Sequence, residues 1–582
     1  MYLKQTPQKS GRVSLSIVEG WWDPKLKRAR QHTVENLGYL DELEKVHDDA
    51  IAWGKARAQA LTNQKKISEQ EVLIGIHPGQ KIDKRSDTRK NIGCAIPLSI
   101  YSGLNIEYTL RNHTRNLKTS YDVNAILRLL VAERICNPSS KLSAWHNKGN
   151  YFFRTQFSDD DVYRSLDVFA QAKDKLIAAM NRSIAKAKMR DLSAVYYDVT
   201  NYYFEIDQED SLRRKGVSKE HRTEPIVQMG LLQDAKGIPL AYRKFPGNTS
   251  DCATMIPVLE DMKHSYQLER IVTVADKGLN CSENIAAAVA SGDGFVFSQS
   301  VRGTKSDSAL KAWITADEGY TYKSEDGQTF KWKSKQGYKT VHLKANDTSS
   351  NKAQDVDIEV KYVAFWSEKY ARRAQHERQK AIDKAKKLIA NPGAYTKATS
   401  HGAAQYIKNL HFNKETGEII DSHTLELDWS AITEAEKYDG YYLIVTSEKG
   451  WSNSKIINTY RELWKIEESF KITKSELKTR PVYVWTPQHI EAHFLICYIA
   501  LVILRLLQVT SKIPCSVIRE EIAAMSGTNV ESNWWVFDHR TDASDLLVEI
   551  LGLEELKLKN LTTTHAMDIL AKAAKGKIPQ SK

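Results

Sequence analysis

The chain has 582 residues, and 84 Lys and Arg against 72 Asp and Glu give a formal net charge of +12 and a pI near 9.0. Hydrophobic residues make up 41% and charged residues 27%, which excludes a disordered or collagen-like chain and is typical of several globular domains. A positive excess of this size favours a polyanionic partner.

The cysteine pattern and the apolar runs indicate the cellular compartment in which the protein is expected. The six cysteines are scattered and form no CxxC pair, which excludes a zinc ribbon, argues against a disulfide scaffold and favours a reducing compartment. The most apolar stretch, Phe494 to Leu504, is shorter than the ~20 residues of a membrane span. The N-terminus has no apolar signal core. We therefore expect a soluble, cytoplasmic protein without a membrane partner.

The first third of the chain contains basic clusters, followed by a pattern that predicts helices. Residues 1–30 hold seven Lys or Arg against Glu19 and Asp23. Apolar residues at helical spacing then extend from about Ser120 to Met189, as in VNAILRLLVAERI. NPSS at 137–140 predicts a break that begins the next helix.

The apolar period then changes to that of strands. The segments SAVYYDVTNYYFEI (193–206), ERIVTVADKG (269–278) and GFVFSQS (294–300) each predict one strand, and 226–248 predicts two strands around a turn at Asp234–Gly237. The polar stretch 207–224 predicts a loop.

The pattern loosens from 301 to 435. It predicts antiparallel β structure and then a basic helix at 367–390, where the window 361–390 holds nine Lys and Arg against three acids. A strand at 438–448 and helices at 454–477 and 489–507 follow. The core thus begins as strands, is interrupted by a long insertion and resumes as strand and helix.

Asp198 lies inside the apolar and aromatic strand VYYDVTNYYF. Strand alternation puts it on the same face as Tyr196, Thr200 and Tyr202. An ionised carboxylate in a buried strand is costly unless a positive group meets it. Asp198 is therefore either an edge-strand acid paired with a lysine or a residue of a cation site.

Asp276 ends the apolar run IVTVA. Catalytic groups often lie at the carboxyl ends of strands, where the edge of a sheet opens into a crevice. The alternative is a turn residue that caps a helix near Ser282 to Asn284.

Glu467 belongs to a stripe on the predicted helix 454–477. Tyr460, Glu467 and Lys474 are spaced by seven residues, which returns them to nearly the same helix face. Leu463 and Phe470 lie between them, so the stripe is partly apolar and points toward an interior or a cleft. The alternative is a heptad seam with charges at its margin.

Together, Asp198, Asp276 and Glu467 make a candidate oxygen-only site for a divalent metal. Mg²⁺ prefers carboxylate ligands, with phosphate and water completing its shell. Two such ions ~3.5–4 Å apart activate an attacking oxygen and stabilise a leaving one in phosphodiester displacement. The hypothesis requires the three side chains to converge in space.

This order of strand Asp, strand-end Asp and helix Glu resembles the DDE transposases of bacterial insertion sequences. Within them it is similar to the insertion-sequence-four superfamily, which has a largely β insertion between the second Asp and the Glu. The matching stretches are YYDVTNYYFE, GLLQDAKGIPLAYRKFPGNTSD, VTVADKG and YRELWKIEESFKITKSELKTRPVYV, which cover 195–300 and 438–505 well.

The helix signature of that superfamily is Tyr, two residues, Arg, three residues, Glu, six residues, Lys. Tyr460, Glu467 and Lys474 match it in register, whereas Leu463 occupies the Arg position and Arg461 points elsewhere on the helix. The resemblance implies that Asp198, Asp276 and Glu467 are catalytic and hold the metal. It also implies that Tyr460 and Lys474 contact phosphates of the transposon end.

The resemblance implies an α/β fold with a ribonuclease-H-like mixed-sheet catalytic core in two parts, 191–300 and 436–510. A largely β insertion domain, 301–435, would interrupt it. The expected flanking parts are an N-terminal DNA-binding region, 1–118, a helical DNA-binding or linker region, 119–190, and a C-terminal helical region, 511–582.

The implied function is transposition with Mg²⁺, for which Mn²⁺ is expected to substitute. Water nicks the phosphodiester at the end of the element, and the freed 3′ hydroxyl then attacks target DNA or forms a hairpin. The expected partners are double-stranded DNA, at element ends and target, and a second copy of the chain in a homodimeric synaptic complex. The protein would associate with the nucleoid when bound to DNA.

Two rival functions are open. A tyrosine recombinase would use Tyr460 as its nucleophile and need no metal. A degenerate or domesticated sequence-specific DNA-binding protein would lack catalysis, and Leu463 leaves room for it. The absence of a GxxxxGK[ST] loop argues against an ATP-driven step.

Three further features each have two interpretations. The basic helix 367–390 either grips DNA or is a solvated face. Trp464 either stacks on a flipped or frayed base in a DNA contact or belongs to the core. His489 and His493 lie four apart in HIEAH rather than HExxH, so we expect a packed His493 rather than a zinc ligand.

Overall fold

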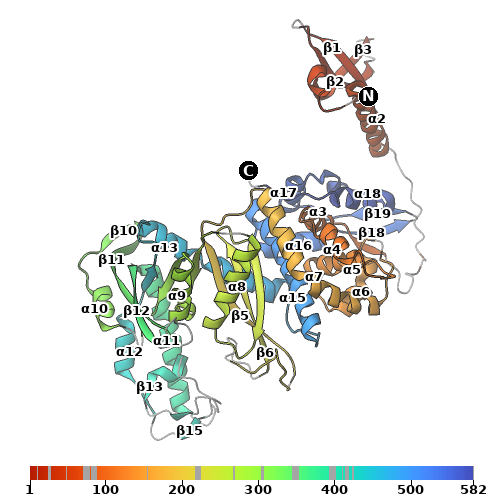
Figure 1. Cartoon of the computed structure of the whole chain (residues 1–582). Helices are drawn as coiled ribbons and strands as arrows, with labels where there is room; N and C mark the ends of the chain where they lie inside the picture. Colours follow the sequence, from red (N-terminus) through yellow and green to blue (C-terminus); the bar gives the residue numbers. More distant parts are fainter. Residues whose placement is uncertain are drawn as a thin grey trace. The chain divides into compact units, whose positions relative to one another are not determined.

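The computed structural model divides the chain into two compact units, Met1–Lys84 and Arg85–Lys582 (Figure 1). It describes all residues except 9–10, 24–27, 48, 70–78, 80, 82–87, 154, 207, 217–223, 267–268, 303–306, 344–352, 392–401, 409–410, 413–418, 422–424, 532 and 581–582. The predicted loop at 207–224 lies in part outside the described residues.

The first unit is a three-stranded antiparallel sheet with helices. Its strands β1 (Tyr2–Pro7), β2 (Val13–Asp23) and β3 (Arg28–Tyr39) pair in the order β1-β2-β3. Helices α1 (Leu40–Leu43) and α2 (Ala50–Glu69) follow. Leu15, Ile17 and Val18 are buried. This unit is shorter than the predicted DNA-binding region 1–118, whose role stays a prediction.

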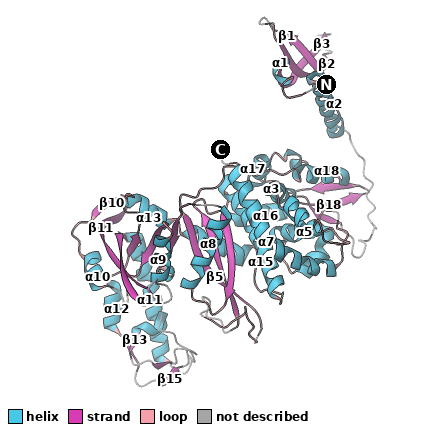
Figure 2. Cartoon of the chain, in the orientation of Figure 1, coloured by secondary structure: helices cyan, strands magenta, loops and turns pink. Residues whose placement is uncertain are grey.

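A nine-stranded mixed sheet forms the centre of the second unit (Figure 2). Its order is β10-β11-β12-β17-β9-β8-β5-β6-β7. The bounds are β5 Val195–Tyr203, β6 Ile226–Asp234, β7 Pro239–Pro246, β8 Val272–Ala275, β9 Gly294–Gln299, β10 Thr321–Glu325, β11 Gln328–Leu343, β12 Gln354–Ser367 and β17 Tyr441–Thr446. The pairs β5–β8 and β8–β9 are parallel, and all other pairs are antiparallel. The strands predicted on each side of the insertion are confirmed, because their apolar residues fill both faces of a buried sheet.

The two faces of this sheet belong to separate apolar clusters. Tyr196, Tyr202 and Val274 point to a core shared with α13 (Asn453–Arg461), α14 (Trp464–Lys471) and α15 (Pro487–Ser511). Tyr197 and Ala275 point to a second core, which contains apolar residues of α8 (Cys252–Tyr266), α9 (Ser282–Ala290) and α10 (Ser308–Thr315). The polar chemistry considered below lies on the first face.

The insertion adds strands to the central sheet and also contains helices. Strand β12 pairs with β17, so β10, β11 and β12 extend the core sheet. Between the strands lie α10, α11 (Glu368–Ala390) and α12 (Trp429–Glu436). Short segments η5 (Gly402–Tyr406), β13 (Ile407–Lys408), β14 (His411–Phe412), β15 (Ile419–Asp421) and β16 (Glu426–Leu427) complete it. Helix α11 forms because Ile382, Ala385 and Leu388 recur at helical spacing and are buried.

The remaining helices pack around α15 on one side of the sheet (Figure 1). They are α3 (Ala95–Gly103), α4 (Ile106–Thr114), α5 (Val123–Cys136), α6 (Lys141–His146), α7 (Asp159–Lys186), α16 (Cys515–Ala524), α17 (Asp542–Leu551) and α18 (Thr563–Ala573). Helix α6 begins after the predicted break, with the Ser140 hydroxyl as its cap. Helix α15 is long and apolar enough to cross a membrane, but 94% of its most apolar window is buried inside the protein, as in a core helix.

The C-terminal region is not only helical. Strands β18 (Ser526–Glu531), β19 (Trp534–Phe537) and β20 (Asn560–Thr562) join β4 (Arg89–Asn91) in a four-stranded sheet of order β20-β19-β18-β4. Residues near 90 therefore belong to the same compact unit as the C-terminus. Their local sequence gives no sign of this pairing, because the partner strand lies more than 400 residues away.

Candidate active site

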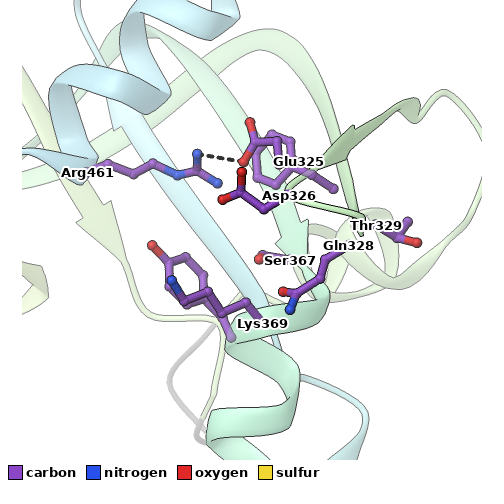
Figure 3. Close-up of a pocket in the computed structure, with 9 residues that line it drawn as sticks. Glu325, Asp326, Gln328, Thr329, Ser367, Lys369 and Arg461 are labelled. Atoms are coloured by element: carbon purple, nitrogen blue, oxygen red, sulfur yellow. Dashed lines mark hydrogen bonds and ion pairs between the residues drawn. The ribbon is translucent and has the colours of Figure 1, made fainter.

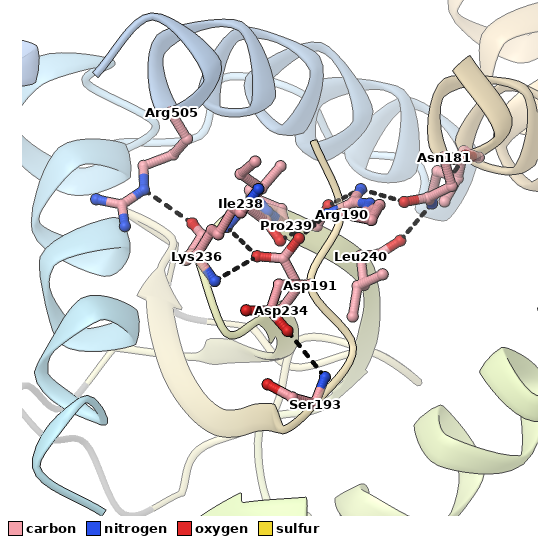
Figure 4. A network of polar contacts seen from close by, with 12 residues as sticks. Asn181, Arg190, Asp191, Ser193, Asp234, Lys236, Ile238, Pro239, Leu240 and Arg505 are labelled. Carbon is pink, nitrogen blue, oxygen red and sulfur yellow. Dashed lines mark hydrogen bonds and ion pairs between the residues drawn. The ribbon is translucent and has the colours of Figure 1, made fainter. Parts of the chain in front are cut away.

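A buried polar network fixes the strand that carries Asp198. Arg190 Nη1 lies 3.0 Å from Asp234 Oδ2, with both side chains buried, at the turn between β6 and β7 (Figure 4). The Asp234 carboxylate also accepts the backbone N–H groups of Lys236 and Ile238. Burial raises the pKa of Asp234, against the Arg190 charge, which lowers it. Arg190 therefore opposes the effect of burial on this carboxylate.

Helices α14 and α15 hold the same turn. Arg505 of α15 donates from Nε to the Gly237 carbonyl at 2.8 Å (Figure 4). Lys465 of α14 donates to the Ala235 carbonyl at 2.8 Å, and the Ala235 N–H donates to the Asp191 carbonyl at 3.0 Å. The entry to β5 and the helix that carries Glu467 are thus tied to one turn.

Asp198 lies on β5, and Asp276 directly follows the end of the neighbouring parallel strand β8. Strand β5 pairs with β8 so that Tyr196 is opposite Val274, and each aspartate follows two residues later. Tyr196 and Val274 share one apolar cluster, so alternation directs both carboxylates to the same face. The Tyr196 hydroxyl donates to the Thr459 carbonyl at 2.9 Å, which identifies this face as the one covered by α13.

The interpretation of Asp198 as an edge-strand acid paired with a lysine is wrong about the position of the strand. Strand β5 lies between β8 and β6 in the interior of the sheet, so Asp198 is not an edge-strand acid. Its side chain is half-buried.

Asp276 has two hydroxyl donors and does not cap a helix. Its Oδ1 accepts from the Ser298 hydroxyl at 2.8 Å and from the Tyr460 hydroxyl at 3.4 Å. It precedes the short 3₁₀ turn η2 (Lys277–Leu279) without a capping hydrogen bond, and Cys281 occupies the N-cap of α9. The capping alternative is therefore wrong.

Burial and the Asp276 carboxylate raise the pKa of Tyr460 above its ordinary value. This phenol therefore stays protonated and acts as a donor to Asp276.

The predicted helix 454–477 is broken into three pieces. Helix α13 ends at Arg461, α14 begins at Trp464, and a π-helical turn, η6, covers Ile472–Glu476. Because of the break and the wider π turn, the three stripe residues differ in exposure: Tyr460 and Lys474 are half-buried, and Glu467 is exposed. Lys474 Nζ lies 5.8 Å from the ring centre of Tyr202 on β5.

Buried neighbours fix the position of Glu467. Ile466 and Phe470 belong to the core below α14, and Ser469 is hydrogen-bonded to Gln233 of β6. Glu467 in the first turn is left at the solvent boundary, where its charge acts on Arg373 of α11.

Arg373 of α11 interacts electrostatically with Glu467, and Tyr442 of β17 with Asp276. The Arg373 guanidinium is paired with Glu377, and this pair, together with the Glu467 charge, raises the pKa of Arg373. Burial and Tyr370 raise the pKa of Tyr442, and the Asp276 charge acts in the same direction. The Arg373 charge acts on Tyr442 as well and opposes this rise in its pKa.

The donors of this site are hard oxygen ligands suited to Mg²⁺ or Mn²⁺: three carboxylates and the Ser298 hydroxyl. Among the described residues, no group of three or more His, Cys, Asp or Glu side chains lies close enough to hold a metal ion. The structure brings Asp198 and Asp276 to one face and places Glu467 on the adjoining helix. Their convergence on a metal stays a prediction.

A pocket of about 290 Å³ lies beside this site (Figure 3). Arg461 reaches into it, paired with Glu325 at 3.0 Å, and Lys369 lies on the other side. Tyr370, which also lines the pocket, packs against Tyr442 with ring centres 5.3 Å apart. Arg461 therefore points toward β10, and Leu463, at the usual arginine position, is buried.

The structure distinguishes between the two interpretations of Trp464 and of His493. Trp464 is 52% exposed, so it is not a core residue, and its DNA contact stays a prediction. His493 is buried and bonded to the Thr479 carbonyl at 2.8 Å and to Lys141, whereas His489 faces Asp167. The packed interpretation of His493 is therefore confirmed.

Three residues of the site were not found from the sequence. Ser298 lies in the strand GFVFSQS and pairs with Asp276 only through the order of strands β8 and β9. Tyr442 and Arg373 lie on β17 and α11, far apart in sequence. The sequence showed that Arg373 belongs to a basic helix, but no local sequence pattern related that helix to Glu467.

One family model matches about half of the chain. A family model described as the transposase DDE domain matches residues 206–503, which include Asp276 and Glu467 and begin after Asp198. A comparison with curated proteins gives no match. Six chains of solved structures match, and one of them is the piggyBac transposase in a synaptic complex with hairpin DNA. Its TM-score is 0.33 at 7% identity, over 84% of this chain and 87% of that chain.

Proposed function

Because the chain belongs to the DDE transposase family, we propose that it cleaves the ends of an insertion sequence and transfers the freed strand to target DNA in a metal-dependent reaction. Asp198, Asp276 and Glu467 would hold the metal. DDE transposases generally use divalent metal ions, and the oxygen donors here favour Mg²⁺, with Mn²⁺ as a substitute.

One observation carries the proposal. Asp198 and Asp276 follow in-register positions on adjacent parallel strands and face the helices that carry Tyr460 and Glu467. The strand order β9-β8-β5-β6-β7, with β5, β6 and β7 antiparallel and β5, β8 and β9 parallel, supports a ribonuclease-H-like core of the predicted kind. The proposed membership in the insertion-sequence-four superfamily rests on the match of Tyr460, Glu467 and Lys474 to its helix signature.

The side chains have separable tasks in this proposal. Bound divalent cations supply activation of the attacking oxygen and charge neutralisation at the phosphate. Ser298 and Tyr460 donate to Asp276 and orient its carboxylate. Tyr460 and Lys474 would contact phosphates at the element end, and Trp464 would stack on an unpaired base.

DNA binding would also involve the first unit. In the first unit, Trp21 and Trp22 are 44% and 63% exposed, and Arg30 lies opposite Trp21 on β3. Exposed tryptophans beside guanidinium groups suit a nucleic-acid surface. Two protomers would hold two ends in one synaptic complex.

The main alternative is a degenerate or domesticated DNA-binding protein without catalysis, favoured by Leu463 at the usual arginine position. A tyrosine recombinase is disfavoured, because burial and Asp276 raise the pKa of Tyr460 and so oppose formation of the nucleophilic phenolate.

A nicking assay on element-end DNA separates these functions. The proposal expects cleavage with Mg²⁺, none with chelator, and loss of cleavage with retained DNA binding in Asp198→Ala. Cleavage that persists in chelator, or in Asp198→Ala, would reject the assignment. Binding without any cleavage under all metal conditions would establish the non-catalytic alternative.

A further inference from the structure

Helix α11 has a buried face and an opposite face that is strongly basic. Arg378, Ile382, Ala385 and Leu388 are buried, and Arg378 pairs with Asp439 and Glu436. On the opposite side five exposed cations recur at spacings of three, four or seven residues. This α11 basic face consists of Lys369, Arg373, Lys380, Lys384 and Lys387.

The charges of this face are largely uncompensated. Arg373 pairs with Glu377 at 3.0 Å, whereas Lys369, Lys380, Lys384 and Lys387 have no ion pair with any residue that the structure describes. Lysines three or four positions apart repel each other by roughly 0.2–0.5 kcal/mol per pair. The helix dipole favours cations in the last turn, which accounts for Lys387 but not for Lys369, Arg373 or Lys380. A polyanion along the face would relieve this repulsion.

The basic face begins at the catalytic site. Arg373 lies close enough to Glu467 for their charges to interact, and Lys369 lines the pocket that Arg461 enters (Figure 3). The helix then runs from the sheet toward β13 and β15 (Figure 1). From Lys369 to Lys387 the face is about 27 Å long at ~1.5 Å per residue, which matches about eight base pairs at ~3.4 Å each.

We propose that the α11 basic face binds the phosphate backbone of the duplex that leads away from the scissile bond. This inference rests on the proposed function, since it takes the substrate to be duplex DNA cleaved beside Glu467. The contact is with phosphates and therefore independent of base sequence. It would fix the direction in which the DNA leaves the site.

The test compares two triple variants of the full chain. One replaces Lys380, Lys384 and Lys387 by Gln. The matched control replaces three exposed lysines of the C-terminal region, Lys512, Lys559 and Lys575, by Gln, and thus has the same net charge. Binding to a mixed-sequence duplex of about 30 base pairs is measured by fluorescence anisotropy in EDTA over a range of salt concentrations.

The α11 variant should bind at least about tenfold more weakly at moderate salt, and its slope of log affinity against log salt should fall by about 2.7, at ~0.9 per lost phosphate contact. The control should retain the wild-type slope. Equal slopes in all three proteins would overturn the inference, as would equal losses in both variants. Because no cleavage occurs in EDTA, this result is independent of whether the enzyme proves to be catalytic.

Discussion

Replacing Arg190 by Met should destabilise the second unit strongly. The change leaves the Asp234 carboxylate, whose side chain is fully buried, with backbone N–H donors but without its cation. Removing one partner of a buried ion pair costs about 3–5 kcal/mol. The unit Arg85–Lys582 has an unfolding entropy of about 1 kcal/mol/K at ~2.1 cal/mol/K per residue, so its midpoint should fall by about 3–5 °C.

A double-mutant cycle separates the ion pair from a general packing effect. Asp234→Asn alone leaves Arg190 buried without a counter-charge and should also be destabilising. The double variant removes both charges and should be more stable than the sum of the single losses predicts. Differential scanning calorimetry of the four proteins gives the midpoints, and native-state hydrogen exchange at β6 and β7 locates the change.

If the two single losses simply add in the double variant, the ion pair contributes no coupling energy. If Arg190→Met leaves the midpoint unchanged, the pair does not stabilise the second unit. Either result would mean that the turn between β6 and β7 does not depend on the ion pair, and that the network does not position β5.

Three further predictions concern the site and the core. Ser298→Ala removes the hydroxyl that donates to Asp276 at 2.8 Å. Since a hydrogen bond to a charged group is worth about 1.5–3 kcal/mol, single-turnover nicking should slow about tenfold or more. An unchanged rate would show that this contact is dispensable. Tyr460→Phe should slow nicking only a few-fold, whereas total loss with a trapped protein–DNA adduct in the wild type would indicate a tyrosine nucleophile. Burial and the Arg134 charge lower the pKa of Lys141 to about 7. The unfolded chain therefore binds the extra proton between about pH 7 and 10.4, and stability from this group rises with pH across that window and is constant below it. Lys141→Met should flatten the thermal midpoint against pH over this range, and an identical pH dependence in both proteins would contradict it.

The strands of the core could be predicted because their signal is local. Val195 to Tyr203, Ile226 to Pro246 and Tyr441 to Thr446 are apolar runs bounded by turns, and both faces of the sheet are buried. The order of the strands could not be obtained from these runs, since it depends on pairing across the insertion, as between β12 and β17.

The sequence singled out the candidate carboxylates but did not predict the geometry around them. Asp198 and Asp276 stood out as carboxylates in apolar strands, and their shared face follows from alternation. The break after Arg461 and the π turn at Ile472–Glu476 were not visible in the heptad spacing, because seven-residue periodicity assumes one continuous helix. The electrostatic interaction of Arg373 with Glu467 depends on where α11 packs, which no local pattern predicts.

The central claim is that Asp198, Asp276 and Glu467 share divalent cations, and Mn²⁺ binding to the DNA-bound protein tests it most directly. Electron paramagnetic resonance titration should show tight Mn²⁺ sites in the wild type that are lost or greatly weakened in Asp198→Asn, in Asp276→Asn and in Glu467→Gln, while DNA affinity is retained. Equal Mn²⁺ binding in the wild type and the three variants would contradict the account.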